Sequence, residues 1–200
     1  MLEVVTPPAE QPVSLAEAKL HCRVDNDDED AWFTIRIGAA TKLCETMCGR
    51  AFITQTLRHW RDAFPSGCTT GRRQVGIMLP RPKVQSVTSV KYIDTTGTLQ
   101  TLSASNYKAD LVSEPALIVP AFGTYWPAAR DEINAIQVEY VAGWGNAAAC
   151  DERAKQAILL IVSHWYENRE SVLIGTISKE VEFSVRALMG DLWHGELELG

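Results

Sequence analysis

The spacing of apolar residues changes twice along this chain, and this constrains the fold more than any other feature. Up to residue 50, and again after residue 142, apolar residues recur every three to four positions, as on one side of a helix. Between residues 51 and 142 they tend to alternate with polar residues, as in strands with one buried face. The sequence therefore predicts an α+β protein. Its helical core, residues 1–50 and 143–200, has two N-terminal and two C-terminal helices, and a β-rich insertion, residues 51–142, lies between helices 2 and 3.

The N-terminal segment leads into the first predicted helix. Residues 1–13 contain three prolines and are expected to be extended. Ser14 and Glu17 form a Ser-x-x-Glu capping box, which predicts a short helix through about His21.

The second predicted helix follows an acidic run, residues 27–30, whose charges favour a helix N-terminus. Asp27 or Asp28 can cap it, and Gly49 is a natural residue to end it after Cys48. Apolar positions at intervals of three and four predict a stripe, with smaller or apolar residues beside it. The stripe is Trp32, Ile35, Ala39, Leu43 and Met47, and the residues beside it are Ile37, Ala40, Cys44 and Cys48.

A long amphipathic pattern begins at Asp151, whose charge with that of Glu152 suits the start of a helix. Its apolar face is wide enough to be covered on most sides, by the chain's own core or by another subunit. The face comprises Ala154, Ile158, Ile161 and Trp165, with Ala157, Leu160 and His164 beside them. A second helical pattern begins near Phe183.

Seven segments of the central region alternate as strands do, and 136–142 alternates most clearly. Asp94 to Gly97 predicts a hairpin loop, with Gly97 available for a positive φ. The candidate strands are 52–60, 75–79, 84–93, 99–102, 107–112, 117–119 and 136–142.

Composition narrows the function classes. A chain of 200 residues can bury a core without a disulfide or a metal. Its net charge of −6 argues against a protein whose main task is to grip DNA phosphates. Five cysteines, an odd number with no scaffold spacing, favour a reducing compartment. No signal peptide is visible, and the longest apolar run, residues 157–162, is too short to cross a membrane.

Three groups of residues could carry chemistry. Cys44 and Cys48 could supply two zinc ligands, but no second pair exists at ligand spacing, so core packing is favoured. His164 and Glu167 have the spacing of a metal-binding pair in a single copy, so a structural histidine or an interface pair is favoured. Residues 58–61 mix basic and aromatic side chains, as single-strand binders do, but an alternating strand has the same pattern. No catalytic site, metal or cofactor is predicted.

Fragments in order along nearly the whole chain resemble the tailed-phage head–tail connector family, also called adaptor or head-completion proteins. The C-terminal signature is His164 to Glu170, followed by Gly175 to Ser178. Each fragment is weak alone, their ordered combination is specific, and none is a catalytic motif. The other fragments are residues 15–20, 23–25, 27–30, 49–56, 79–82 and 140–143.

The resemblance implies a structural virion protein and not an enzyme. Members of the family form a ring, commonly of twelve copies, beneath the portal protein, and extend the DNA channel. They also present a surface to a stopper or tail-completion protein. Double-stranded DNA would pass without specific recognition, and no membrane is involved. The location would be the head–tail interface of the virion, and the host cytoplasm during assembly. Compact members have a much smaller insertion, so the resemblance assigns no role to residues 51–142.

The C-terminal part, residues 165–199, is the expected docking region. It combines residue types that anchor interfaces with an apolar segment, residues 172–177, that is expected to order on assembly. The alternative is that this segment packs over the subunit's own core. The expected interface residues are Trp165, Tyr166, Arg169, Leu173, Ile174 and Ile177.

Two other function classes stay open at this point. A DNA-binding or packaging accessory protein would bind duplex DNA in a salt-dependent way. A metal-dependent hydrolase would contain stoichiometric metal.

Overall fold

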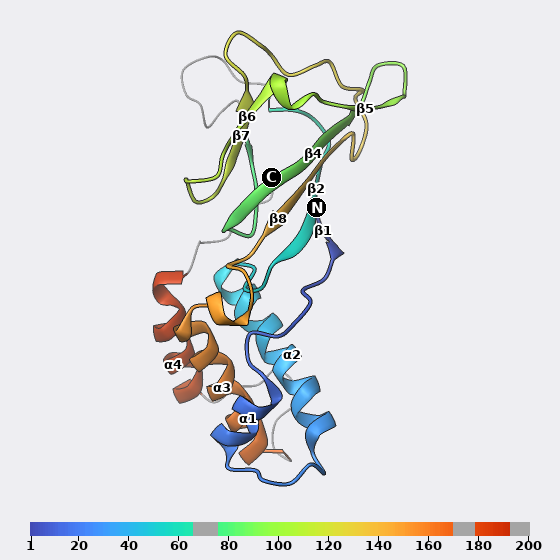
Figure 1. Cartoon of the computed structure of the whole chain (residues 1–200). Helices are drawn as coiled ribbons and strands as arrows, with labels where there is room; N and C mark the ends of the chain where they lie inside the picture. Colours follow the sequence, from blue (N-terminus) through green and yellow to red (C-terminus); the bar gives the residue numbers. More distant parts are fainter. Residues whose placement is uncertain (66–75, 170–178, 193–200) are drawn as a thin grey trace. The chain divides into compact units, whose positions relative to one another are not determined.

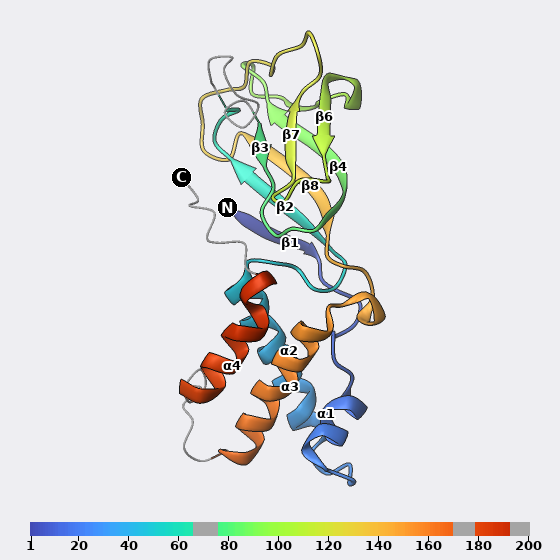
Figure 2. The same ribbon diagram turned by 90° about the vertical axis from the view of Figure 1, so that its left-hand side faces the viewer.

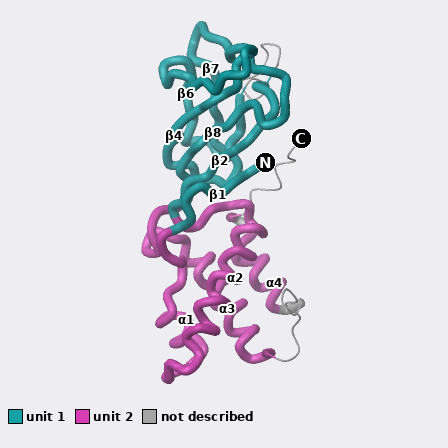
Figure 3. The backbone as a smooth tube through the Cα atoms, turned by 90° about the vertical axis from the view of Figure 1, so that its right-hand side faces the viewer, with its two compact units in different colours: residues 1–8, 54–143, 196–200 teal, residues 9–53, 144–195 magenta. Residues whose placement is uncertain are grey.

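The computed structural model describes residues 1–65, 76–169 and 179–192 (Figure 1). The chain divides into two compact units, coloured separately in Figure 3. The sheet unit contains the described residues of 1–8 and 54–143, and the helical unit those of 9–53 and 144–192. The predicted α+β class is confirmed, with two α-helices before the strands that start at residue 55 and two after them.

The helical unit is built around α3, which packs against the other three α-helices. Its buried face includes Ala154, Ile158, Ile161 and Trp165, as the sequence predicts. Val185, Met189 and Leu192, at and after the fourth helix, complete the core. The elements are α1 Leu15–Cys22, α2 Asp30–Cys48, η2 Ala147–Ala149, α3 Glu152–Glu167, α4 Lys179–Met189 and η3 Gly190–Leu192.

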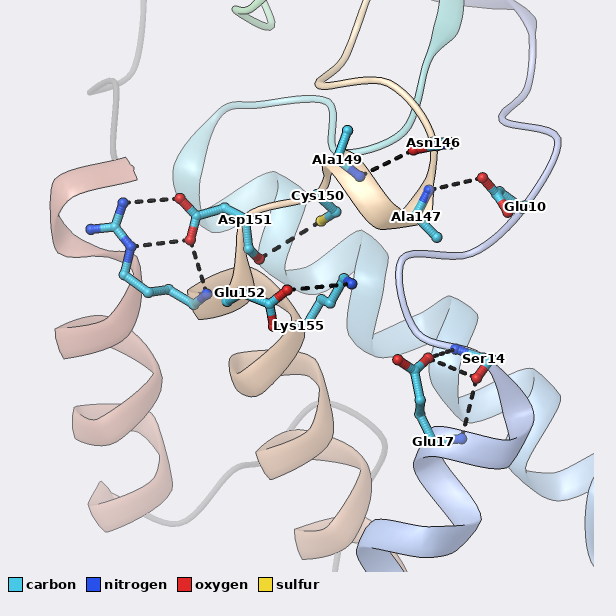
Figure 4. Close-up of polar contacts among 11 residues, drawn as sticks. Glu10, Ser14, Glu17, Asn146, Ala147, Ala149, Cys150, Asp151, Glu152 and Lys155 are labelled. Atoms are coloured by element: carbon cyan, nitrogen blue, oxygen red, sulfur yellow. Dashed lines mark hydrogen bonds and ion pairs between the residues drawn. The ribbon is translucent and has the colours of Figure 1, made fainter.

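Polar caps stabilise the starts of α1 and α3 (Figure 4). The capping box of α1 is confirmed, because Glu17 N donates to Ser14 Oγ at 3.2 Å while Ser14 N donates to a Glu17 carboxylate oxygen at 2.7 Å. At α3 the Asp151 carboxylate accepts from Arg153 N at 2.9 Å. The backbone nitrogen of Ala147 donates to Glu10 at 2.8 Å, which ties the N-terminal segment to η2.

The core-facing side of α2 differs from the predicted stripe. The buried residues are Phe33, Ile37, Ala40, Thr41, Cys44 and Cys48, whereas Ile35 is 69% exposed. Both sets satisfy the three-and-four spacing, and they lie side by side on the helix. Packing against α3 selects the second set, whose small Ala40 and Cys44 allow close approach.

The predicted cap of α2 is also wrong. Its N-cap residue is Glu29, whose side chain makes no capping hydrogen bond. Asp27 and Asp30 instead accept hydrogen bonds from Lys19 Nζ, at 2.6 and 2.7 Å. These bonds join α1 to the loop that precedes α2 and to the first residue of α2. The end of α2 is as predicted, with Gly49 at φ 68°.

The sheet unit contains two antiparallel sheets, and the smaller lies across one face of the larger (Figure 2). The predicted strands 84–93 and 136–142 have the same bounds in the structure. The N-terminal residues, predicted only as extended, form a strand that pairs with β2. The five-stranded sheet has the order β1-β2-β8-β4-β5, with β1 Leu2–Thr6, β2 Gln55–Arg61, β4 Val84–Ile93, β5 Leu99–Thr101 and β8 Ile136–Ala142. The three-stranded sheet has the order β3-β7-β6, with β3 Ile77–Met78, β6 Tyr107–Asp110 after η1 Ala104–Asn106, and β7 Leu117–Pro120.

Alternation decides which side chains of this unit are buried. Leu57 pairs with Tyr140, and Val90 pairs with Val138, so their side chains share one face of the larger sheet. All four side chains are at most 2% exposed. The Tyr140 hydroxyl donates to the Pro80 carbonyl at 2.6 Å, which satisfies a polar group in an apolar interior. The hairpin at Asp94–Gly97 is confirmed, with Gly97 at φ 88°.

We predict that the helical unit folds without the sheet unit. Within the helical unit, Trp144 N donates to Phe52 O at 3.0 Å, and Ile53 forms a parallel bridge with Gly145. A short linker in place of residues 54–143, with residues 1–8 removed, should therefore leave a helical protein with a cooperative melt by circular dichroism. An insoluble or unfolded product would show that the two units depend on a shared core.

Candidate interaction surfaces

Aromatic side chains from the start of α2 and the end of α3 form one cluster. The rings of Phe33 and Tyr166 stack with centroids 5.2 Å apart, and Trp32 meets both rings edge-on. We call Trp32, Phe33, Tyr166 and Arg169 the aromatic cluster. Edge-on and stacked pairs at these separations add to the stability gained from burial alone.

Arg169 connects this cluster to Glu29. Its guanidinium donates to both carboxylate oxygens of Glu29, with Nη2 2.8 Å from Oε2, and lies 4.3 Å from the Tyr166 ring centroid. The hydrogen bond from Arg169, followed by that from Tyr166, lowers the pKa of Glu29. Both side chains are partly exposed, so solvent screens the ion pair. These contacts with Glu29 and Tyr166 fix the position of Arg169, two residues after the end of α3.

The structure brings together three of the six predicted interface residues. Trp165, Tyr166 and Arg169 all lie at the end of α3, but Trp165 is only 6% exposed and packs in the helical core. The Arg36 guanidinium lies 5.7 Å from its ring centroid. The other three, Leu173, Ile174 and Ile177, lie outside the described residues.

Sequence reasoning missed two partners in this cluster. It interpreted Glu29 only as part of a helix start, and it placed Phe33 in no stripe. Their link to Arg169 and Tyr166 spans more than 130 residues, and no local spacing reports such a pairing. The one available signal was composition, since aromatic residues and arginine are enriched at both places.

The cysteine pair of α2 lies in the helical core. Cys44 and Cys48 are fully buried, and burial raises the pKa of the Cys44 thiol to about 12, with Cys48 adding to the effect. A thiol with so high a pKa is a poor source of the thiolate that zinc requires. Across residues 1–65, 76–169 and 179–192, no group of three or more His, Cys, Asp or Glu could hold a metal ion.

The other candidate pair, His164 and Glu167, lies near the end of α3. His164 Nδ1 is 3.3 Å from the amide nitrogen of Asn168, which also donates to the His164 carbonyl at 2.9 Å. Glu167 is exposed. This arrangement is typical of a helix end held by a side-chain amide.

Part of the basic and aromatic run of β2 is engaged by acidic side chains. Arg58 pairs with Glu139 at 2.8 Å, and Trp60 Nε1 donates to Glu3 at 3.0 Å. His59 points to the opposite face of the strand and is 4% exposed. Acidic neighbours therefore engage Arg58 and Trp60, two of the four residues that the sequence offered to nucleic acid.

The described helices contain none with the length and apolar character needed to cross a membrane.

The comparisons with known proteins agree with the fold. The family model described as "Head completion protein" matches residues 13–180. The chain therefore belongs to the head completion protein family, and it is a structural head–tail component. No curated protein matches it.

Solved structures similar to the whole chain come from a gene transfer agent, or GTA. A chain in the neck of the empty GTA particle, computed with C6 symmetry, has a TM-score of 0.76 and 22% identity. A chain of the native GTA virion has a TM-score of 0.76 and 21% identity, and one in the native neck, computed with C12 symmetry, has 0.74 and 20%. Each match covers 100% of this chain and 98% of the other. At these identities the likeness shows the fold.

Proposed function

We propose that this protein is a subunit of a ring, commonly of twelve copies, that sits beneath the portal protein and extends the DNA channel. On its other side the ring docks a stopper or tail-completion protein. The observation that carries the proposal is the match of the whole fold, β-rich part included, to chains from a particle neck. Rings of identical subunits need different, complementary surfaces on each subunit. The ring would assemble in the host cytoplasm and reside in the virion.

We assign the contact with the portal or with a neighbouring subunit to the C-terminal residues. The aromatic cluster supports this, because Tyr166 and Arg169 are fixed to α2 just before residues 170–178. Trp165 would support the contact from within the core. The proposed interface residues are Trp165, Tyr166, Arg169, Leu173, Ile174 and Ile177.

Ile174→Asp should leave the subunit folded, with a nearly unchanged melting temperature, while ring formation or portal binding fails. The control is Ile161→Asp, which places a charge in the α3 core, where the native side chain is fully buried, and should cost several kcal/mol. Electron microscopy of each purified variant mixed with portal protein measures assembly. A collapse of the Ile174→Asp melting temperature would show that this residue packs in the subunit's own core.

In this proposal, double-stranded DNA passes through the ring without specific recognition. A net charge of −6 and the pairing of Arg58 with acidic residues leave little to grip phosphates. We expect at most weak, strongly salt-dependent binding to duplex DNA. Tight binding at physiological salt would favour the packaging-accessory function instead.

A further inference from the structure

The strand β1 is one edge of the five-stranded sheet and pairs only with β2 (Figure 1). The backbones of Met1 and Trp60 exchange two hydrogen bonds, at 2.8 and 3.1 Å, so the polar groups of Met1 face β2. Because facing and outward residues alternate along an antiparallel strand, the N–H and C=O groups of Leu2 and Val4 point away from β2. Among the residues that the structure describes, none bonds to these outward groups. We call the outward side of residues 1–4 the open edge.

An apolar row of the larger sheet ends at the open edge. Val4 pairs with Leu57, and Leu57 pairs with Tyr140, so the three side chains lie on one face of the sheet. Leu57 is 2% exposed and Tyr140 is fully buried, whereas Val4 is 53% exposed. An apolar side chain on a further strand, placed beside Val4, would therefore continue the row and cover its last member.

The opposite face of the sheet carries an excess of negative charge at the open edge. Glu3, Arg58 and Glu139 are neighbours across β1, β2 and β8. One guanidinium thus serves two carboxylates, 3.5 Å from Glu3 and 2.8 Å from Glu139. Glu3 Oε2 accepts the hydrogen bonds from both Arg58 and Trp60, which leaves Oε1 open to a further donor. A lysine or arginine opposite Glu3 would be attracted, and an acidic residue there would be repelled.

Two features confine the open edge to residues 1–4. The register of β1 against β2 shifts between Val4 and Thr6, and Pro7 and Pro8 follow in the sequence. A bulge bends a strand, and a proline has no N–H group to donate, so pairing beyond Val4 is unfavourable. The edge therefore suits a short extended segment and not the edge of a second large sheet.

We propose that the open edge binds an extended segment of another polypeptide, which adds one strand to the sheet. Main-chain hydrogen bonds to Leu2 and Val4 hold this segment, as in other complexes formed by strand addition. Its apolar residues lie beside Leu2 and Val4, and a lysine or arginine between them lies beside Glu3. This surface goes beyond the proposed function, because it belongs to the sheet unit and does not depend on a ring.

The charge at Glu3 distinguishes this partner from segments of the same chain. Residues 196–199, Glu-Leu-Glu-Leu, alternate as a strand requires, but in such a strand Glu198 would lie beside Glu3. A second copy of β1, paired antiparallel, would bring its own Glu3 to the same place. Both arrangements oppose like charges, which is unfavourable across neighbouring strands.

Two acetylated and amidated peptides that differ in one residue test the proposal, Thr-Val-Lys-Val-Thr and Thr-Val-Glu-Val-Thr. Nuclear magnetic resonance of the full chain follows the backbone amide signals as each peptide is added. The lysine peptide should shift the signals of Leu2 and Val4 and leave those of β5, the opposite edge strand, unchanged. It should bind about fivefold more tightly than the glutamate peptide. No shift in β1, equal shifts at both edges, or no preference for lysine would overturn the proposal.

The variants Val4→Pro and Glu3→Gln separate the two parts of this recognition. Proline at position 4 removes an outward N–H group and no bond to β2, so the chain should stay folded while binding of the lysine peptide falls about fivefold or more. Glutamine at position 3 keeps an acceptor for Trp60 but not the charge, so the two peptides should bind equally.

Wild-type binding by a folded Val4→Pro, or an undiminished preference for lysine in Glu3→Gln, would contradict the proposal. If Val4→Pro lowers the melting temperature, the result for Glu3→Gln decides alone. A third chain lacks residues 193–200. Binding that appears only in this shortened chain would also overturn the proposal, because the chain's own C-terminal residues would then be the occupant of the edge.

Discussion

Acidification from pH 7 to pH 4 should lower the free energy of unfolding by about 3 kcal/mol through His59 alone. The side chain is 4% exposed, and its Nδ1 has no hydrogen-bond partner among the described residues. Burial lowers the His59 pKa from 6.5 to about 4, and the positive charges of Arg61 and the N-terminal amine add to the effect. Between pH 6.5 and about pH 4, His59 is therefore protonated in the unfolded chain but mostly neutral in the folded chain. The stability is complete above pH 6.5 and is lost as the pH falls towards 4.

The variant His59→Leu isolates this contribution. Leucine suits the position between Leu2 and Val138 on the neighbouring strands and cannot be protonated. Relative to the wild type, it should gain about 3 kcal/mol on going from pH 7 to pH 4. Hydrogen exchange of the β2 amides at the two pH values measures the difference for the sheet unit. Equal pH dependence in both proteins would mean that His59 is protonated without cost.

Arg50→Met should lower the free energy of unfolding of the helical unit by about 3 kcal/mol. Arg50 follows α2 and is 6% exposed. Its Nε donates to the Leu192 carbonyl at 2.7 Å in a buried hydrogen bond, and its guanidinium lies 5.9 Å from the Trp144 ring centroid. Methionine keeps the apolar stem but leaves that carbonyl unsatisfied. The loss should also loosen η3.

The matched control is Arg186→Met on α4. Its guanidinium side chain is 70% exposed and pairs with Glu182 one turn away, so the change should cost no more than about 0.5 kcal/mol. Urea unfolding followed by circular dichroism measures both variants. Similar midpoints for the two would falsify the assignment of Arg50 as a buried support of the helical unit.

Local patterns predicted most of the secondary structure. Alternation defined β4 and β8 because each has one buried face, and the three-and-four spacing found the core side of α3. The same spacing failed in α2, where Trp32, Ile35 and Ala39 compete with Phe33, Ile37 and Ala40. Only the shape of the packing partner distinguishes such neighbouring stripes. β1 was missed as a strand because its partner, β2, lies some 50 residues away.

The candidate site was predictable only in part. Residue type pointed to Tyr166 and Arg169, because aromatic side chains and arginine anchor interfaces. Their partners on α2 were not predictable, since the contacts of Glu29 and Phe33 join distant parts of the sequence.

The backbone leaves the helical unit after Ile53 and returns at Trp144, and these two points are joined by the Phe52–Trp144 hydrogen bond and the Ile53–Gly145 bridge. We therefore expect a change in the length or content of the intervening chain to leave the path of α2 and α3 unaltered. An engineer can use the same junction to graft a foreign domain, such as a fluorescent protein, whose termini are similarly close.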